Sequence, residues 1–189
     1  MERKTVLDAD IEKVLISAEE LDALTDKIAR EIDRDYKDSG KRLLLLCILK
    51  GSVVFMGDLM KKLTIPVEID FMKVSSYGAG TETTGRIKIL LDLHRPDLSE
   101  LDIVIVEDII DSGRTLSYLV DYLHLGGAHS VKTCTLLDKP SRRQIEFTPD
   151  YTGKVIPDEF VVGYGLDYAE QYRALPYVGV LKPEIYEGK

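Results

Sequence analysis

The residues with the clearest chemical potential lie in one short stretch near the middle of the chain. Three carboxylates, Glu107, Asp108 and Asp111, are closely followed by two hydroxyl residues, Ser112 and Thr115. A glycine between the two hydroxyls lets a ligand approach the backbone closely. Amides at the N-terminus of a helix, supplemented by hydroxyl groups, bind anions and suit a phosphate best. The stretch therefore predicts a phosphate-binding loop with acids at its side.

The acids pose a problem, because carboxylates repel a bare phosphate. The conflict disappears if they have other tasks, which are to accept hydrogen bonds from sugar hydroxyls, to hold Mg²⁺ or to take a proton. A phosphate loop beside two carboxylates that bind sugar hydroxyls, Glu107 and Asp108, describes a site for a ribose 5-phosphate.

The elements that must position this loop can be read from the pattern around it. Residues 103–106 are apolar and β-branched, which is typical of a strand covered on both faces. After Thr115 the apolar residues recur at helical spacing, at Leu116, Leu119, Val120 and Leu123. The loop therefore lies at the carboxyl end of a central strand, where open α/β sheets bind their ligands.

A second strand, loop and helix precede the first. Residues 43–49 form a continuous apolar run of strand length that breaks sharply at Lys50, Gly51 and Ser52. Apolar residues at helical spacing follow in residues 53–63. This is a second potential anion loop, although a turn containing lysine and glycine is weak support without other information.

The remaining segments alternate between helix and strand signals. The residues 17–20 read as a capping box that opens a helix. Strand patterns, in chain order, cover residues 67–74, 86–91, 131–137 and 177–181. Residues 77–85, rich in glycine and threonine, predict a mobile loop.

Residues 107–115 resemble the phosphoribosyl-pyrophosphate (PRPP) signature of the type I phosphoribosyltransferases. Further similar stretches, at residues 49–52 and 156–168, extend the resemblance from about residue 14 to residue 181. Within the family they are similar to the group that acts on hypoxanthine and guanine. The resemblance implies an α/β fold with a central, mostly parallel sheet flanked by helices, a small hood and a flexible lid loop. It implies one domain over residues 1–189, with a core of about residues 40–165, a hood from the two terminal segments and a lid of about residues 75–86.

The resemblance also implies a role for each group of site residues. The PRPP- and phosphate-binding set is Lys50, Gly51, Glu107, Asp108, Asp111, Ser112, Gly113, Arg114, Thr115 and Arg173. In this set Asp111 is the expected general base for the purine N7 proton. Mg²⁺ is the expected cofactor, near Glu107, Asp108 and Asp167. Ser52 and Gly165 are small neighbours of these motifs, and we expect their substitution to leave the chemistry unaltered.

The base would be held by a separate set of residues, Lys139, Phe160, Val161 and Asp167. The Lys139 ammonium can only donate hydrogen bonds, so it suits the exocyclic oxygen of a 6-oxopurine and not the amino group of adenine. Phe160 would stack on the purine, an aromatic contact worth roughly 1–3 kcal/mol. Val161 and Asp167 would meet the base edge through their backbones. Ser76 and Tyr77 would form the tip of a lid that excludes water.

Composition limits the alternatives. A chain of 189 residues with 44% hydrophobic and 31% charged residues is typical of a soluble domain. We expect no membrane span and a cytoplasmic location, and the net charge of −8 argues against a nucleic-acid partner. Cys47 and Cys134 both lie in apolar runs and are expected to be buried thiols. The expected partners are PRPP, hypoxanthine, guanine and further copies of the chain, as a dimer or tetramer.

Two other functions stay open at this point. The first is a regulator of the same fold that binds RNA, which would need a basic surface patch. The second is a phosphoribosyltransferase for another base, such as xanthine or a pyrimidine. Lys139 and Phe160 favour 6-oxopurines but do not separate hypoxanthine, guanine and xanthine.

Overall fold

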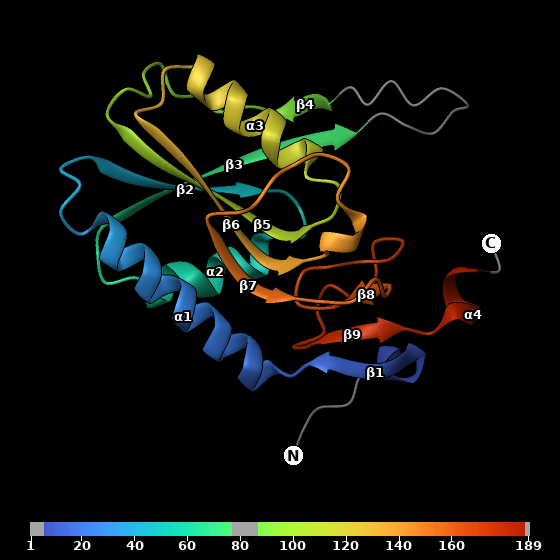
Figure 1. Ribbon diagram of the computed structural model, residues 1–189. Coiled ribbons are helices and arrows are strands. Elements are labelled where there is room, and N and C mark those ends of the chain that lie inside the picture. The colour runs from blue at the N-terminus through green and yellow to red at the C-terminus, as the bar shows by residue number, and fades with distance from the viewer. Residues whose placement is uncertain (1–5, 77–86, 188–189) are drawn as a thin grey trace.

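The computed structural model describes residues 6–76 and 87–187, and its elements are drawn in Figure 1. In chain order they are η1 (Val6–Asp10), β1 (Ile11–Ile16), α1 (Ala18–Tyr36), β2 (Arg42–Ile48), α2 (Val53–Lys62), β3 (Val67–Ser76), β4 (Ile87–Leu91), β5 (Leu101–Ile110), α3 (Arg114–Leu125), β6 (Ser130–Asp138), η2 (Pro140–Arg142), β7 (Tyr151–Val155), β8 (Val161–Val162), β9 (Val178–Leu181) and α4 (Pro183–Tyr186).

A central sheet of six strands organises the molecule, in the order β4-β3-β2-β5-β6-β7. Strands β3, β2, β5, β6 and β7 are parallel, and only the edge strand β4 is antiparallel to its neighbour β3. The strand with the acidic loop, β5, lies between β2 and β6. The loops that follow β2, β5 and β6 therefore emerge at the same edge of the sheet, as expected for parallel strands.

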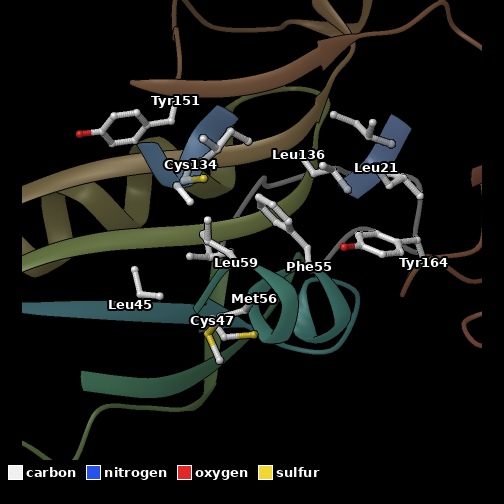
Figure 2. Close-up of a cluster of buried hydrophobic side chains, with 14 of the residues drawn as sticks. Leu21, Leu45, Cys47, Phe55, Met56, Leu59, Cys134, Leu136, Tyr151 and Tyr164 are labelled. Atoms are coloured by element: carbon white, nitrogen blue, oxygen red, sulfur yellow. The ribbon is translucent and has the colours of Figure 1, made fainter. Parts of the chain in front are cut away.

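Alternate residues of the central strands face opposite sides, and helices cover both (Figure 1). Leu45 and Cys47 of β2 pack in a cluster with residues of α1 and α2, part of which Figure 2 shows. Leu44 and Leu46 of the same strand face the cluster that includes α3. Burial on both faces explains why β2 and β5 read as continuous apolar runs. Cys47 and Cys134 are buried free thiols, as predicted.

The two ends of the chain meet in a second, small sheet with the order β1-β9-β8. Strand β9 is antiparallel to both of its neighbours. This sheet holds the segment with Phe160 and Val161 next to the C-terminal helix α4 (Figure 1). Within residues 6–76 and 87–187, no helix is long and apolar enough to cross a membrane.

Helix α1 begins where the capping box predicts. The Ser17 hydroxyl accepts a hydrogen bond from the Glu20 amide at 3.2 Å, which satisfies a free amide of the first turn. The Glu20 carboxylate pairs with Lys154 instead of returning to the cap, so only half of the capping box forms. The helix buries Leu21, Ile28 and Ile32.

Candidate active site

The loop after β5 has the geometry of an anion site. Gly113 is the N-cap of α3, and its φ of 81° lies in the left-handed region that glycine tolerates best. The Ser112 hydroxyl accepts a hydrogen bond from the Arg114 amide at 3.3 Å. A cavity of about 140 Å³ is lined by residues that include Glu107, Asp111, Ser112, Gly113 and Thr115. The sequence-predicted phosphate loop is therefore an open cup with acids at its side.

The acid pair at the end of β5 is under electrostatic strain. Burial, with the neighbouring charge of Asp108, raises the pKa of Glu107 well above its usual range. Burial also raises the pKa of Asp108 to about 6, although hydrogen bonds from backbone amides and the charge of Arg173 act in the opposite direction. The Glu107 Oε2 atom is buried and has no hydrogen-bond partner among the described residues. A buried oxygen of this kind is costly unless a ligand uses it.

The loop after β2 lies directly against this acid pair. The peptide bond between Leu49 and Lys50 is cis. A Cβ atom on Gly51 would lie 1.5 Å from the Asp108 carboxylate oxygen, so only glycine fits there. The second anion loop thus adjoins the first.

One expectation about the neighbours of these loops is wrong. Gly165 has a φ of 103°, and a Cβ atom there would lie 1.9 Å from the Gly51 carbonyl oxygen. Ser52 is fully buried, and its hydroxyl donates to the Ile48 carbonyl. Because both residues shape the loop that holds Gly51, we now expect their substitution to disturb the site.

Two cations, Lys50 and Arg173, come from separate segments of the chain and have acidic partners. Arg173 donates from Nη1 to the Gly165 carbonyl at 2.8 Å and pairs with Asp167 at 2.8 Å through Nη2. The Lys50 ammonium lies 3.0 Å from both carboxylate oxygens of Glu170. Nη2 of Arg173 also lies 3.4 Å from Oε2 of Glu170, so Lys50 and Arg173 share this carboxylate although they are far apart in sequence.

Three of the four predicted purine residues, Lys139, Phe160 and Val161, lie near the end of the next strand, β6, whereas Asp167 pairs with Arg173. Lys139 directly follows β6, and its amide donates to the Ile110 carbonyl at 3.0 Å, which places it beside the start of the phosphate loop. Its side chain is nearly buried, and its ammonium donates to the Glu159 carbonyl at 2.7 Å. Phe160 keeps 38% of its surface exposed, whereas Val161 is buried in β8. An aromatic ring with an open surface beside a desolvated ammonium can bind a flat, carbonyl-bearing base.

Two residues that the sequence interpretation missed support these groups. The Arg143 guanidinium, itself largely buried, donates to the Asp111 carbonyl at 2.5 Å and to the Asp138 carboxylate at 2.5 Å. It thus links the predicted phosphate loop to the strand end that carries Lys139. The Tyr186 ring stacks on Phe160, with centroids 4.7 Å apart and an interplanar angle of 19°. Tyr168 meets the same ring edge-on at 5.6 Å.

Not every predicted residue is brought into a common site. Arg114 is exposed at the start of α3. Ser76 is the last residue of β3, and Tyr77 lies outside the described residues, so the predicted lid stays a prediction. In the described part of the chain, no three histidine, cysteine or acidic side chains form a ready-made metal site. Glu107, Asp108 and Asp167 are therefore not a complete metal cage by themselves.

Comparison with known proteins agrees with this geometry. Residues 17–169 match the model of the phosphoribosyl transferase domain. The chain belongs to the phosphoribosyl transferase domain family. The resemblance found in the sequence and the fold that it implied are thereby confirmed.

The relatives that this chain resembles include two kinds. The hypoxanthine-guanine phosphoribosyltransferase of Lactococcus lactis is 52% identical over 95% of this chain and 96% of its own. The bifunctional protein TilS/HprT of Listeria monocytogenes is 54% identical over 94% of this chain, which spans only 27% of that longer relative. The crystal structure of a hypoxanthine phosphoribosyltransferase from Staphylococcus aureus superposes with a TM-score of 0.91 at 45% identity, covering 98% of this chain and 99% of that one.

Proposed function

We propose that this protein is a purine-salvage enzyme that transfers the 5-phosphoribosyl group of PRPP to hypoxanthine or guanine. The products would be IMP or GMP and pyrophosphate. The observation that carries the proposal is the junction of two half-sites at neighbouring strand ends. The acid-flanked phosphate cup after β5 is bonded, through the Ile110 carbonyl, to the amide of Lys139 after β6. The names of the relatives with which the chain aligns nearly end to end support the same reaction.

The phosphate half would hold and orient PRPP. Ser112, Gly113, Arg114 and Thr115 would bind the 5-phosphate with backbone amides, hydroxyls and one cation. Glu107 and Asp108 would accept hydrogen bonds from the ribose hydroxyls, which fixes the anomeric carbon toward the base. Lys50, Gly51 and Arg173 would bind the pyrophosphate group and stabilise the negative charge that develops as it leaves.

The purine half would present the base to that carbon. Lys139 would donate to the exocyclic oxygen of a 6-oxopurine, and Phe160 would stack on its ring. Val161 and Asp167 would bind the base edge through their backbones. Asp111, exposed at the lip of the phosphate cup, would take the proton from purine N7 as that ring attacks the sugar.

The donor groups fit Mg²⁺. Its preferred ligands are oxygens, and it keeps several waters, so an incomplete set of protein carboxylates is the expected arrangement. Glu107 supplies a buried oxygen without a partner, and Asp108 and Asp167 are the other carboxylates that would hold the ion or its waters. Bound Mg²⁺ would neutralise charge on the leaving pyrophosphate.

The broader organisation follows the same proposal. The chain would be one catalytic domain, with the central sheet as its core and the small terminal sheet as a hood over the purine half. A lid that includes Ser76 and Tyr77 would close over the sugar and exclude water. We propose a cytoplasmic enzyme that forms a dimer or tetramer and has PRPP, hypoxanthine and guanine as its small-molecule partners. Nucleic acids and membranes would not be partners.

A base panel tests the proposal. The purified protein is given PRPP and Mg²⁺ with hypoxanthine, guanine, xanthine, adenine or uracil separately, and nucleotide formation is followed. We expect turnover of hypoxanthine and guanine, loss of turnover with EDTA, and none with adenine or uracil. The ratio of xanthine to guanine turnover measures how strongly the site discriminates between substituents at the purine 2-position. Absence of nucleotide with every base would refute the proposal.

A further inference from the structure

Glu170 is a charged residue of the site to which the proposed reaction assigns no task. Its carboxylate lies 3.0 Å from the Lys50 ammonium through both oxygens. Its Oε2 atom also lies 3.4 Å from Nη2 of Arg173. One carboxylate thus bridges two cations that come from separate loops of the chain. These are the same two side chains that would bind pyrophosphate.

The arrangement makes two anions compete for one pair of cations. Carboxylate and phosphate oxygens both accept charge-assisted hydrogen bonds from ammonium and guanidinium groups. While Lys50 is engaged by both oxygens of Glu170, it cannot be fully engaged by a diphosphate. A pyrophosphate group that takes the donors which Glu170 occupies on Lys50 and Arg173 must therefore displace the Glu170 side chain.

The backbone around Glu170 is held in place, whereas the side chain is free to leave. Ala169, Glu170 and Tyr172 have φ values of 50°, 62° and 73°, in the left-handed region that such residues rarely adopt. The Glu170 amide donates to the Asp167 carboxylate at 2.9 Å, which ties the turn down. The Glu170 side chain nevertheless has 67% of its surface exposed. A fixed turn with an exposed side chain returns the carboxylate to the cations whenever they are vacated.

We propose that Glu170 is a built-in competitor for pyrophosphate. Its carboxylate pairs with Lys50 and, beside Asp167, with Arg173 in the free protein, yields to the incoming diphosphate, and takes its place again as pyrophosphate departs. The competition weakens product binding and speeds product release. The inference rests on the proposed function, because it takes the leaving group of that reaction as the competing ligand.

Direct binding of inorganic pyrophosphate tests the competition without turnover. Calorimetry would compare the wild type with Glu170→Gln, which removes the charge at nearly constant size. The matched control is Glu100→Gln, because Glu100 also pairs with a lysine, Lys41 at 2.8 Å, and is 64% exposed. We expect Glu170→Gln to bind pyrophosphate about two to five times more tightly, as expected for exposed ion pairs, and the control to change by less than about twofold.

A second variant and a kinetic measurement distinguish a change in pyrophosphate binding from an effect on folding. Glu170→Asp retains the charge but shortens the side chain, so we expect an intermediate gain in pyrophosphate affinity. In nucleotide synthesis, inhibition by added pyrophosphate should be stronger for Glu170→Gln than for the wild type by the same factor. Unchanged or weaker pyrophosphate binding by a folded Glu170→Gln protein would overturn the inference. If the wild type still formed nucleotide, the proposed function would survive that outcome.

Discussion

The proposed phosphate half and the proposed purine half of the site are built in different ways. The phosphate half, residues 49–52 and 107–115, consists mainly of backbone at the ends of two adjacent parallel strands. Its glycines are packed so closely that a Cβ atom on Gly51 would overlap the Asp108 carboxylate. The purine half, Lys139, Phe160 and Val161, consists of side chains and strand edges from segments that meet only in the folded molecule. Its key ring, Phe160, is supported by Tyr186 from the C-terminal helix.

This difference predicts different responses to mutation. Backbone that is packed without spare room cannot absorb even one methyl group, since close-packed interiors transmit strain. A ring held by stacking can lose one partner and keep part of its function. A single substitution in the phosphate half should therefore abolish its function, whereas a single substitution in the purine half should only weaken base binding.

Substitution of Gly165 by alanine should give the largest effect. The new Cβ atom would lie 1.9 Å from the Gly51 carbonyl in a left-handed backbone conformation. We expect a loss of at least about 3 kcal/mol in the free energy of unfolding and loss of PRPP binding. Gly57→Ala is the control, because a Cβ atom there meets nothing within 4 Å, and it should be neutral or stabilising. Chemical denaturation measures the free energy of unfolding of both variants. Equal values for Gly165→Ala and Gly57→Ala would contradict the prediction.

The buried acid pair should give a pH-dependent effect on stability. Because the pKa of folded Asp108 is raised from 3.8 to about 6, the folded state binds more protons than the unfolded state between these values. Stability is therefore lost as pH rises through this window and stays lost above it. Asp108→Asn should stabilise the ligand-free protein by about 1–3 kcal/mol at pH 8 and hardly at all at pH 4. Urea unfolding at both pH values measures this, and equal gains would contradict the assignment.

Arg143 joins the two halves, so its loss should affect catalysis more than PRPP binding. It fixes the Asp111 carbonyl and the Asp138 carboxylate together. We expect Arg143→Ala to lower kcat by about tenfold, or roughly 1.4 kcal/mol, with less change in KM for PRPP. Added guanidinium should restore part of the rate. Arg30→Ala, at an exposed position of α1, is the control, and equal kinetics for the two variants would refute the linking role.

The purine half should respond most mildly. Tyr186→Ala removes the ring that stacks on Phe160, and we expect KM for hypoxanthine to rise by about threefold, since aromatic pairs are worth roughly 0.5–1.5 kcal/mol. Tyr186→Phe keeps the stack and should retain the wild-type KM. Steady-state kinetics at saturating PRPP separates the two variants. A lower KM in Tyr186→Ala would mean that the tyrosine obstructs the base and does not support its ring.

The same contrast explains what could be predicted from the sequence. The phosphate loop is a contiguous motif between a strand and a helix, so its residues and its place at the end of β5 could be predicted locally. Arg143, Glu170 and Tyr186 could not, because each acts on a partner that only the tertiary fold brings near. For Arg143 the sequence offered only a weak indication, the pair of arginines at 142 and 143 shortly after Lys139. The prediction for Gly165 failed because a carbonyl from a distant loop, that of Gly51, limits its space.

The two halves meet at Asp111, where the phosphate loop is proposed to serve the purine. The most direct test measures kcat and the PRPP dissociation constant of Asp111→Asn with hypoxanthine. The account predicts that kcat falls by about 10²–10⁴-fold, as for loss of a general base, while PRPP affinity stays close to that of the wild type. A wild-type kcat in this variant would contradict the account, because the carboxylate would then have no part in the proton transfer.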